Sequence, residues 1–252
     1  MTLEGRVAFV TGGGRGIGKG IAVALAADGA DVAINYRRDE EAAKETVAEI
    51  ESLGRRAVAY KASIDSVDQD QEMVDAALGT FGHVDILVNN AGIASRGNTV
   101  ADTDPAELAR VVGTHALGAH HLCRMLLPQM RKQERGDIVM ISSVATRDWA
   151  AGGAPYNMAK AALEALAMTL AKEEKGNGIR VNVVAPGLVD TEMGRRLVKG
   201  AMGVQDIRQL DKAMPFGRVC APEDVANVVR FLVSDAGDYI TGQRIYVEGG
   251  GG

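Results

Sequence analysis

The sequence predicts an α/β protein in which a doubly wound parallel sheet carries helices on both faces. Short runs rich in Val, Ile and Ala recur along the chain, and most are apolar without alternation, as is typical of strands buried on both faces. Longer helical patterns separate these runs, so strand and helix alternate throughout. No proline-rich, glycine-rich or highly charged linker divides the 252 residues, so a single domain over residues 1–252 is expected.

The elements follow in order along the chain. The expected strands are the seven apolar runs 6–10, 31–35, 57–62, 85–90, 137–142, 179–186 and 244–250. The expected helices are 16–28, 40–53, 67–81, 105–133, 154–175 and 222–234. The fourth helix has a clear start, with Asp104 as N-cap, Pro105 in the first helical position and Glu107 reaching back to the cap. Repeated strand-helix-strand units predict right-handed crossovers.

Composition argues against several classes of function. The net charge is -5 and the basic residues are scattered, so neither nucleic acid nor a membrane surface is an expected partner. Cys123 and Cys220 show no metal-ligand spacing and are expected to be reduced core thiols. The N-terminal residues lack a signal-peptide pattern, and no apolar run approaches the ~20 residues of a membrane span, so a cytoplasmic protein is expected.

Residues that are awkward for a core follow the strands. In open α/β sheets ligands bind beyond the carboxyl ends of the strands. The segments found there are TGGGRGIG, NYRR, NNAG, SS and APGLVDT, after the first, second, fourth, fifth and sixth strands. We therefore expect the ligand site along this edge of the sheet.

The glycines of TGGGRGIG predict a nucleotide-binding turn. Gly12, Gly16 and Gly18 let the backbone and a helix N-terminus approach a pyrophosphate without obstruction by Cβ atoms. The spacing is not the G-x-G-x-x-G fingerprint, and the alternative is a tight connection with no ligand.

The end of the second strand indicates which dinucleotide is bound. Tyr36 stands where a ribose-binding acid is expected, and Arg37 and Arg38 follow it. Together with Arg15 in the glycine turn, these guanidinium groups suit a 2′-phosphate and favour NADP(H) over NAD(H). The alternative is a solvated basic turn. Asp31 begins the strand, so it lies at the wrong end to bind the ribose.

Five motifs in order resemble those of the short-chain dehydrogenase/reductases, and the resemblance covers nearly the whole chain. They are TGGGRGIG for T-G-x-x-x-G-x-G, NNAG, Ser143, YNMAK for Y-x-x-x-K, and PGLVDT for P-G-x-x-x-T. The closing YITGQRIYVEGG is most similar to the 3-oxoacyl-acyl-carrier-protein reductase branch. The resemblance implies a Rossmann-like three-layer sandwich whose seven-stranded parallel sheet has the order 3-2-1-4-5-6-7.

The resemblance also implies the catalytic residues Ser143, Tyr156 and Lys160. A ketone reduced by hydride needs a proton on its developing alkoxide, and a tyrosine of pKa ~10 is a reluctant donor unless its phenolate is stabilised. Lys160, one helical turn beyond Tyr156, is expected to supply the stabilising charge. Ser143 is expected to hold the carbonyl oxygen, whereas Ser142 points to the other face of its strand. Without the other motifs, Tyr156 and Lys160 would be an ordinary surface pair.

The cofactor-binding residues are also carried over from the family's motifs. Gly92 is expected to admit the adenine ribose, and the Val189 backbone with Thr191 to hold the nicotinamide amide. Asn89 and Asn90 are expected to buttress the central strands, and Asn182 is either structural or part of the site. The expected NADP(H) contacts are Gly12, Arg15, Gly16, Ile17, Gly18, Tyr36, Arg37, Arg38, Ser63, Ile64, Asn90, Ala91, Gly92, Tyr156, Lys160, Pro186, Gly187, Val189 and Thr191.

Two residues depart from the family pattern. His115 stands where many relatives carry an asparagine that bends the helix and holds a water that passes protons to the lysine. It is inert core filling, a structural replacement that hydrogen-bonds a backbone carbonyl, or a catalytic proton relay that titrates near neutrality. Ser63 replaces an aspartate that usually contacts adenine, so weaker cofactor binding is expected. The spacing of His115, His120 and His121 does not suit a metal site, and no metal is expected.

Partners and substrate are less well defined by the sequence. Helices 105–133 and 154–175 are apolar around much of their circumference, and they pair across a two-fold axis in the family, which predicts a homotetramer or homodimer. The alternative is burial within one subunit. A helical insertion at 190–216 is expected to be the substrate lid. Its basic residues Arg195, Arg196 and Lys199 either meet an acidic carrier protein or form a solvated face. Arg147 and Trp149 also point to the pocket.

The expected function is an NADPH-dependent ketoreductase acting on a 3-oxoacyl thioester, a polyketide or another bulky ketone. One alternative is an NAD-dependent dehydrogenase that oxidises an alcohol or sugar. The other is a nucleotide-binding regulator without turnover, for which His115 is the only argument.

Overall fold

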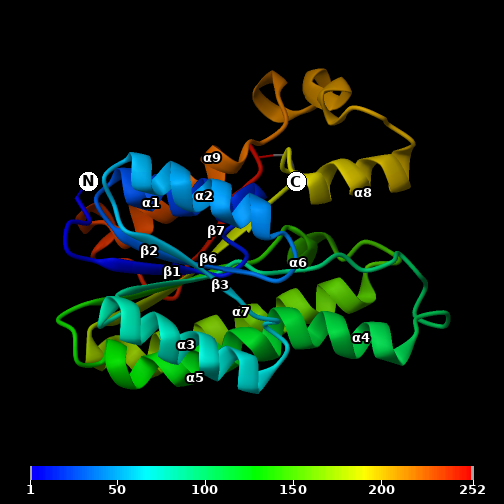
Figure 1. The fold of residues 1–252 in the computed structure, drawn as a ribbon. Helices are drawn as coiled ribbons and strands as arrows, with labels where there is room; N and C mark the ends of the chain where they lie inside the picture. Colours follow the sequence, from blue (N-terminus) through cyan, green and yellow to red (C-terminus); the bar gives the residue numbers. More distant parts are fainter. Residues whose placement is uncertain (1, 251–252) are drawn as a thin grey trace.

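Each apolar run that predicts a strand lies in one parallel sheet in the computed structural model, which describes residues 2–250 (Figure 1). Within these residues the order is β3-β2-β1-β4-β5-β6-β7, which confirms the predicted topology. The strands are β1 (Val7–Val10), β2 (Asp31–Tyr36), β3 (Ala57–Lys61), β4 (Ile86–Asn89), β5 (Gly136–Ile141), β6 (Ile179–Pro186) and β7 (Arg244–Val247). The proposed domain bounds 1–252 include residues 1, 251 and 252, which lie outside the described range.

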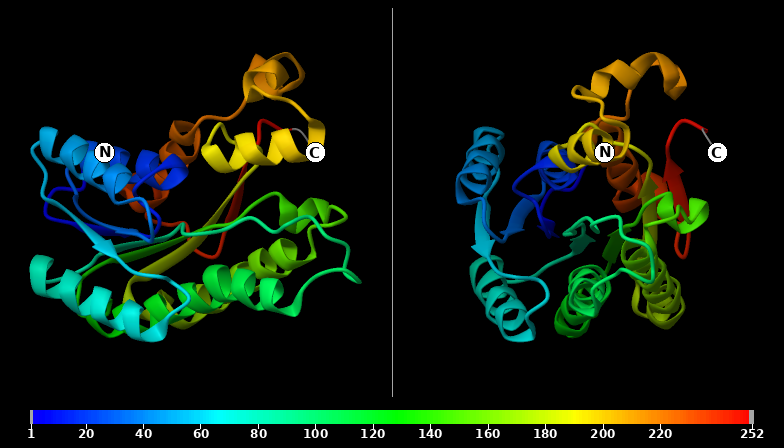
Figure 2. Two further views of the ribbon diagram at one scale, coloured as in Figure 1. Left: turned by 45° about the vertical axis from the view of Figure 1, so that its right-hand side comes forward. Right: turned by 90° about the vertical axis from the view of Figure 1, so that its right-hand side faces the viewer.

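Helices cover both faces of the sheet (Figure 2). One layer consists of α1 (Gly16–Ala27), α2 (Glu40–Ser52) and α9 (Pro222–Val233). The other consists of α3 (Val67–Phe81), α4 (Pro105–Val112), α5 (Gly118–Met130) and α7 (Ala154–Glu174). Asp104 caps α4 as predicted, but Glu107 accepts a hydrogen bond from the Arg96 backbone at 2.6 Å instead of reaching back to the cap.

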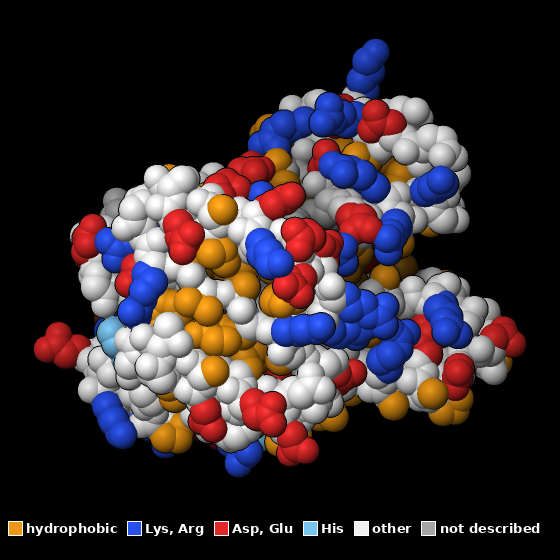
Figure 3. Space-filling view, viewed as in Figure 1, with side chains coloured by type: hydrophobic (Ala, Val, Ile, Leu, Met, Phe, Trp, Pro, Cys, Tyr) orange, Lys and Arg blue, Asp and Glu red, His pale blue; other side chains and the backbone are white. Residues whose placement is uncertain are grey.

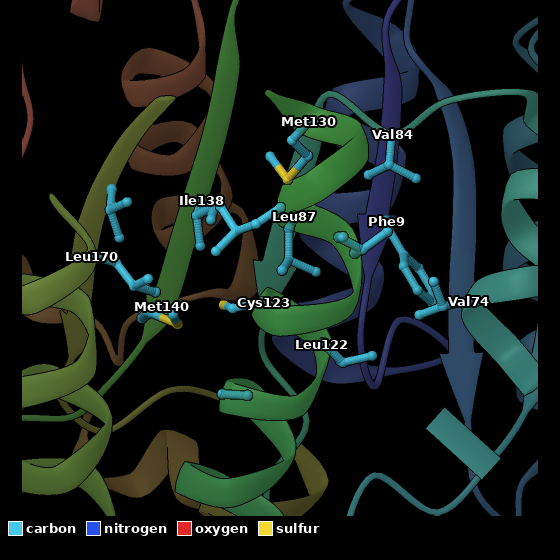
Figure 4. Packing of buried hydrophobic residues seen from close by; sticks show 14 of the residues in the cluster. Phe9, Val74, Val84, Leu87, Leu122, Cys123, Met130, Ile138, Met140 and Leu170 are labelled. Carbon is cyan, nitrogen blue, oxygen red and sulfur yellow. The ribbon is translucent and has the colours of Figure 1, made fainter. Parts of the chain in front are cut away.

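The core has two parts because each strand presents successive residues to opposite faces. Phe9 packs with Leu87, Ile138 and Met140 against α3, α5 and α7 (Figure 4). A second cluster lies between the sheet and α1, α2 and α9. Cys123 is buried in the first cluster and burial raises the pKa of its thiol to about 12, as expected for an inert core cysteine.

The predicted helix 105–133 is wrong in one respect, because it is not continuous. A π-helical turn, η1 (Gly113–Leu117), separates α4 from α5, and α5 ends at Met130. A π turn adds a residue to the helical repeat and shifts the side chains on either side of it. His115 lies in the middle of this turn, at the position predicted to bend the helix.

The predicted lid forms a segment that stands away from the sheet (Figures 1 and 2). It contains α8 (Glu192–Met202) and two short 3-10 turns, η3 (Ile207–Ala213) and η4 (Pro215–Gly217). Its small apolar cluster centres on Val198, Ile207 and Val219. The remaining short elements are α6 (Ala145–Asp148), η2 (Lys175–Asn177) and η5 (Asp235–Gly237). None of the helices within residues 2–250 is both long enough and apolar enough to cross a bilayer.

Candidate active site

The glycine turn between β1 and α1 has a backbone that requires glycine. Gly12 and Gly16 have φ values of 62° and 54°, which side chains disfavour. A methyl group at Gly18 would collide with the carbonyl oxygen of Gly12 and the side chain of Asn90. The N-cap residue Arg15 makes no side-chain cap hydrogen bond, so the N–H groups at the N-terminus of α1 can meet a ligand.

Hydrogen bonds tie this turn to the NNAG segment after β4. The Thr11 hydroxyl accepts from the backbone N–H groups of Asn90 and Ala91, both at 2.9 Å. The Asn90 amide donates to the carbonyl oxygen of Thr11 at 2.8 Å. Asn90 thus supports the glycine turn, whereas Asn89 places its amide against the sulfur atoms of Cys123 and Met140, inside the sheet as predicted.

Asn35 is a site residue that the motifs did not identify. Its buried amide accepts from Gly12 N at 3.3 Å and donates to the Ala62 carbonyl at 3.1 Å, so it connects the glycine turn to the end of β3. The signal for it was a buried polar residue within an apolar strand.

The basic residues at the expected ribose pocket differ in their partners. Arg15 is exposed and pairs with Glu192 of α8 and, at 3.8 Å, with Asp39. Arg37 is half-buried and Arg38 exposed at the end of β2, beside the half-buried Tyr36. Their position at this edge of the sheet agrees with the prediction.

The remaining predicted contacts lie along the same edge, and several are engaged within the protein. The Ser63 hydroxyl donates to Asp65 at 2.5 Å, and the buried Ile64 packs against Gly118. The Ser63 hydroxyl donates its proton to Asp65 but keeps its lone pairs, so it can still accept a hydrogen bond from a ligand.

Beyond β6, the predicted nicotinamide segment joins two neighbouring loops. Pro186 accepts from the Val144 backbone at 3.0 Å, and Gly187 donates to Val247 at 3.0 Å. Thr191 caps α8 by accepting from Gly194 N at 3.1 Å. Asn182 bonds Ile240 and Gln243 before β7, at 2.8 and 3.0 Å, which supports a structural role for it.

Ser143, Tyr156 and Lys160 meet at the end of β5, as the sequence predicts. The Lys160 ammonium is buried, lies 5.6 Å from the centre of the Tyr156 ring and donates to the Ile141 carbonyl at 2.6 Å. A hydrogen bond with Ser143 opposes a rise in the pKa of Tyr156. Serine, phenol and ammonium therefore form one cluster.

The predicted effect of Lys160 on the phenol is not what the structure shows. Burial dominates and raises the pKa of Tyr156 above its ordinary value. Burial also lowers the pKa of Lys160 to about 7, so its ammonium is only partly charged at neutral pH. The phenol consequently stays protonated, the state that a proton donor requires.

His115 lies edge-on to Tyr156, with ring centres 5.3 Å apart. Its Nε2 lies 2.8 Å from the Ile93 carbonyl oxygen and 3.0 Å from the Ile93 backbone nitrogen, so it can donate to the first or accept from the second. Its Nδ1 is buried and has no hydrogen-bond partner within residues 2–250. Burial is the main cause that lowers the pKa of His115 to about 3, and Lys160 adds to it. A ring with so low a pKa is neutral at physiological pH, and the backbone contact supports a structural replacement. The relay that titrates near neutrality stays a prediction.

Two hollows lie elsewhere in the described residues, and neither is lined by Ser143, Tyr156 or Lys160. A cleft of about 610 Å³ runs from the glycine turn along α1 and α9, with Arg15, Gly16 and Thr191 at one end. Neither Tyr156 nor Lys160 lines this cleft. A smaller cavity of about 190 Å³ lies under the lid at Pro215 and Phe216. Figure 3 shows lysine and arginine side chains gathered on the segment above the body.

Comparison with known sequences gives close relatives over the full domain. The family model described as Enoyl-(Acyl carrier protein) reductase matches residues 12–251. The chain is 37% identical over 244 residues to the 3-oxoacyl-[acyl-carrier-protein] reductase FabG of Staphylococcus epidermidis, covering 96% of this chain and 97% of the relative. It is 38% identical over 257 residues to versicolorin reductase of Emericella nidulans, covering 98% and 96%.

Solved structures share the fold. A short-chain dehydrogenase of Burkholderia cenocepacia in complex with NADP superposes with a TM-score of 0.89 at 37% identity, covering 99% of each chain. An NAD+-bound xylitol dehydrogenase gives a TM-score of 0.91 at 30% identity, covering 99% of this chain and 100% of the other. The motifs, the sheet order and these likenesses show that the chain belongs to the short-chain dehydrogenase/reductase family of oxidoreductases.

Proposed function

We propose that this protein is an NADPH-dependent ketoreductase in which Tyr156 donates the proton. The observation that carries the proposal is the cluster of Ser143, Tyr156 and Lys160 at the carboxyl end of the sheet, beside the loops that follow β1, β4 and β6. The likeness to 3-oxoacyl-acyl-carrier-protein reductases supports reduction as the direction of the reaction.

The residues present fit a dinucleotide. No side chain caps the N-terminus of α1, so its first N–H groups can meet a phosphate, and the glycines of the preceding turn put no side chain in the way. Arg37, Arg38 and Arg15 would hold a 2′-phosphate, while Val189 and Thr191 would hold the nicotinamide amide. NADPH, when bound, supplies the hydride.

The protein's own side chains manage the proton and the carbonyl oxygen. Ser143 holds the carbonyl oxygen of the ketone in line with the phenol. Tyr156, kept protonated by burial, gives its proton to that oxygen as negative charge develops there. The charged fraction of Lys160 stabilises the phenolate that is left.

The substrate is a 3-oxoacyl thioester, a polyketide or another bulky ketone, with the lid over 190–216 as its cover. The lid leaves Leu197, Met202 and Phe216 exposed, and these side chains suit an apolar substrate. Arg195 and Arg196 pair with Asp190 and Glu192, which favours a solvated face over a carrier-protein site. We also propose a homotetramer or homodimer through α4, α5 and α7, because Leu117 of the π turn between α4 and α5 and Met158 of α7 are both exposed.

The replacement Tyr156→Phe tests the chemistry directly. Removal of the phenolic oxygen should abolish reduction of a panel of ketones and 3-oxoacyl esters, while NADPH binding, followed by fluorescence titration, remains. Reduction by the variant at the wild-type rate would show that another group donates the proton.

One observation favours an NAD-dependent alcohol or sugar dehydrogenase instead. Glu192 and Asp39 already neutralise Arg15, which lowers its attraction for a 2′-phosphate. Titration with both cofactors separates the two functions, because a large preference for NADH would overturn the assignment of the arginines.

A further inference from the structure

Glu164 is a buried carboxylate that the proposed chemistry does not use. It lies on α7 one turn beyond Lys160, and only 7% of the residue is exposed. Residues four apart on a helix have Cβ atoms ~6 Å from each other, so this charge faces the lysine side of the helix. A buried carboxylate is unfavourable without partners, so its contacts are informative.

Three donors from other elements converge on this carboxylate. Oε1 accepts from the Ser142 hydroxyl at 2.6 Å and from the Thr146 hydroxyl at 2.7 Å. Oε2 accepts from Arg244 of β7 at 2.5 Å. Ser142 and Thr146 bracket Ser143, so the carboxylate holds both ends of the turn that presents the catalytic serine.

The same carboxylate acts on Lys160 through its charge. Burial lowers the pKa of Lys160, and the negative charge of Glu164 opposes this by raising it. The other groups that face Lys160 are Tyr156 on its own helix and the ring of His115, which is neutral at physiological pH.

Resting on the proposed function, we propose that Glu164 is a positioning residue, which fixes the Ser143 turn against α7 and whose negative charge favours the ammonium form of Lys160. Arg244 modulates this effect from β7, because its guanidinium offsets part of the carboxylate charge. The serine and the lysine are thereby set by a single side chain that touches neither substrate nor cofactor.

The test compares three variants with wild type. In Glu164→Gln the amide still accepts from the two hydroxyls but carries no charge. The pKa of Lys160 should then fall, and the alkaline decline of kcat with ethyl 3-oxobutanoate and NADPH should move to lower pH by about one unit, as for a unit charge ~6 Å away at an effective dielectric of ~40. Arg244→Gln should move it to higher pH, because the carboxylate is no longer offset.

Glu174→Gln is the matched control. Glu174 is an equally buried carboxylate of α7 that pairs with Arg131, but it lies ten residues further on, ~15 Å along the helix. Its replacement should leave the pH profile unchanged. If Glu164 had only a structural role, Glu164→Gln and Arg244→Gln would not shift the alkaline decline of kcat in opposite directions, because loss of packing does not depend on the sign of a charge.

NMR titration of [13C]lysine-labelled protein, with Lys160→Met to assign the signal, measures the same shift without turnover. Should Glu164→Gln fail to fold, Arg244→Gln still decides the point. An unchanged pKa of Lys160 in both Glu164→Gln and Arg244→Gln would overturn the inference. If Tyr156→Phe is inactive in the same assays, the proposed function stands nonetheless. An active Tyr156→Phe would instead overturn the proposed function.

Discussion

Replacing His115 by asparagine should make the stability of the protein less sensitive to acid. The imidazole is buried against Gly92 and Tyr156, and burial lowers its pKa to about 3. In the unfolded chain the pKa of a histidine is ~6.5. Below that pH the imidazole binds a proton in the unfolded chain but not in the folded protein, so acid favours unfolding. Asparagine does not titrate, and the variant lacks this penalty.

The size of the effect follows from the two pKa values. At pH 8 both states are neutral and the linkage contributes nothing. At pH 5.5 the unfolded state gains ~1.4 kcal/mol from protonation of His115, while the folded state gains almost none. For a protein of this size ~1.4 kcal/mol corresponds to ~3–6 °C in Tm. The asparagine variant is expected to be less stable at pH 8, because the ring's packing is lost.

Thermal unfolding of both proteins at pH 8 and pH 5.5 measures this difference. The gap in Tm between wild type and His115→Asn should narrow by that amount at the lower pH. Because every other titrating group is common to both proteins, their contributions cancel. An equal gap in Tm at both pH values would refute the claim that the ring is held neutral. A changed pH profile of turnover in His115→Asn would support the relay hypothesis.

Three further predictions test other parts of the structure. Burial raises the pKa of Asp70 on α3 to about 8, so the folded protein retains a proton that the unfolded chain loses above pH ~4. Asp70→Asn should therefore raise the free energy of unfolding, and with it Tm, at pH 8 but not at pH 3. Equal shifts in Tm at both pH values would contradict this. Gly18→Ala should abolish NADPH binding in a fluorescence titration, because its methyl group meets Gly12; unchanged affinity would show that the turn is no cofactor site. Arg37→Ser should raise KM for NADPH about tenfold and leave KM for NADH unchanged, as expected for loss of one charge-assisted hydrogen bond. An equal rise in KM for both cofactors would show that Arg37 does not bind the 2′-phosphate.

The sequence by itself predicted the strands, most of the helices and, through the family resemblance, the candidate catalytic cluster. The strands could be predicted because burial on both faces leaves continuous apolar runs, and 179–186 matches β6 to the residue. The glycine turn was predictable because its backbone angles admit few other residues. Ser143, Tyr156 and Lys160 were identified because the motifs that contain them resemble those of the short-chain dehydrogenase/reductases.

Tertiary structure alone decided the electrostatics of the site and the residues that support it. The sign of the change in the pKa of Tyr156 depends on burial, which no local pattern records. Glu164 and Asn35 act through partners from 18 to 80 positions away in the sequence, so their roles emerge only when the chain is folded. The π turn at His115 likewise depends on packing against the loop at Ile93, because intrinsic helix propensity does not favour the extra residue.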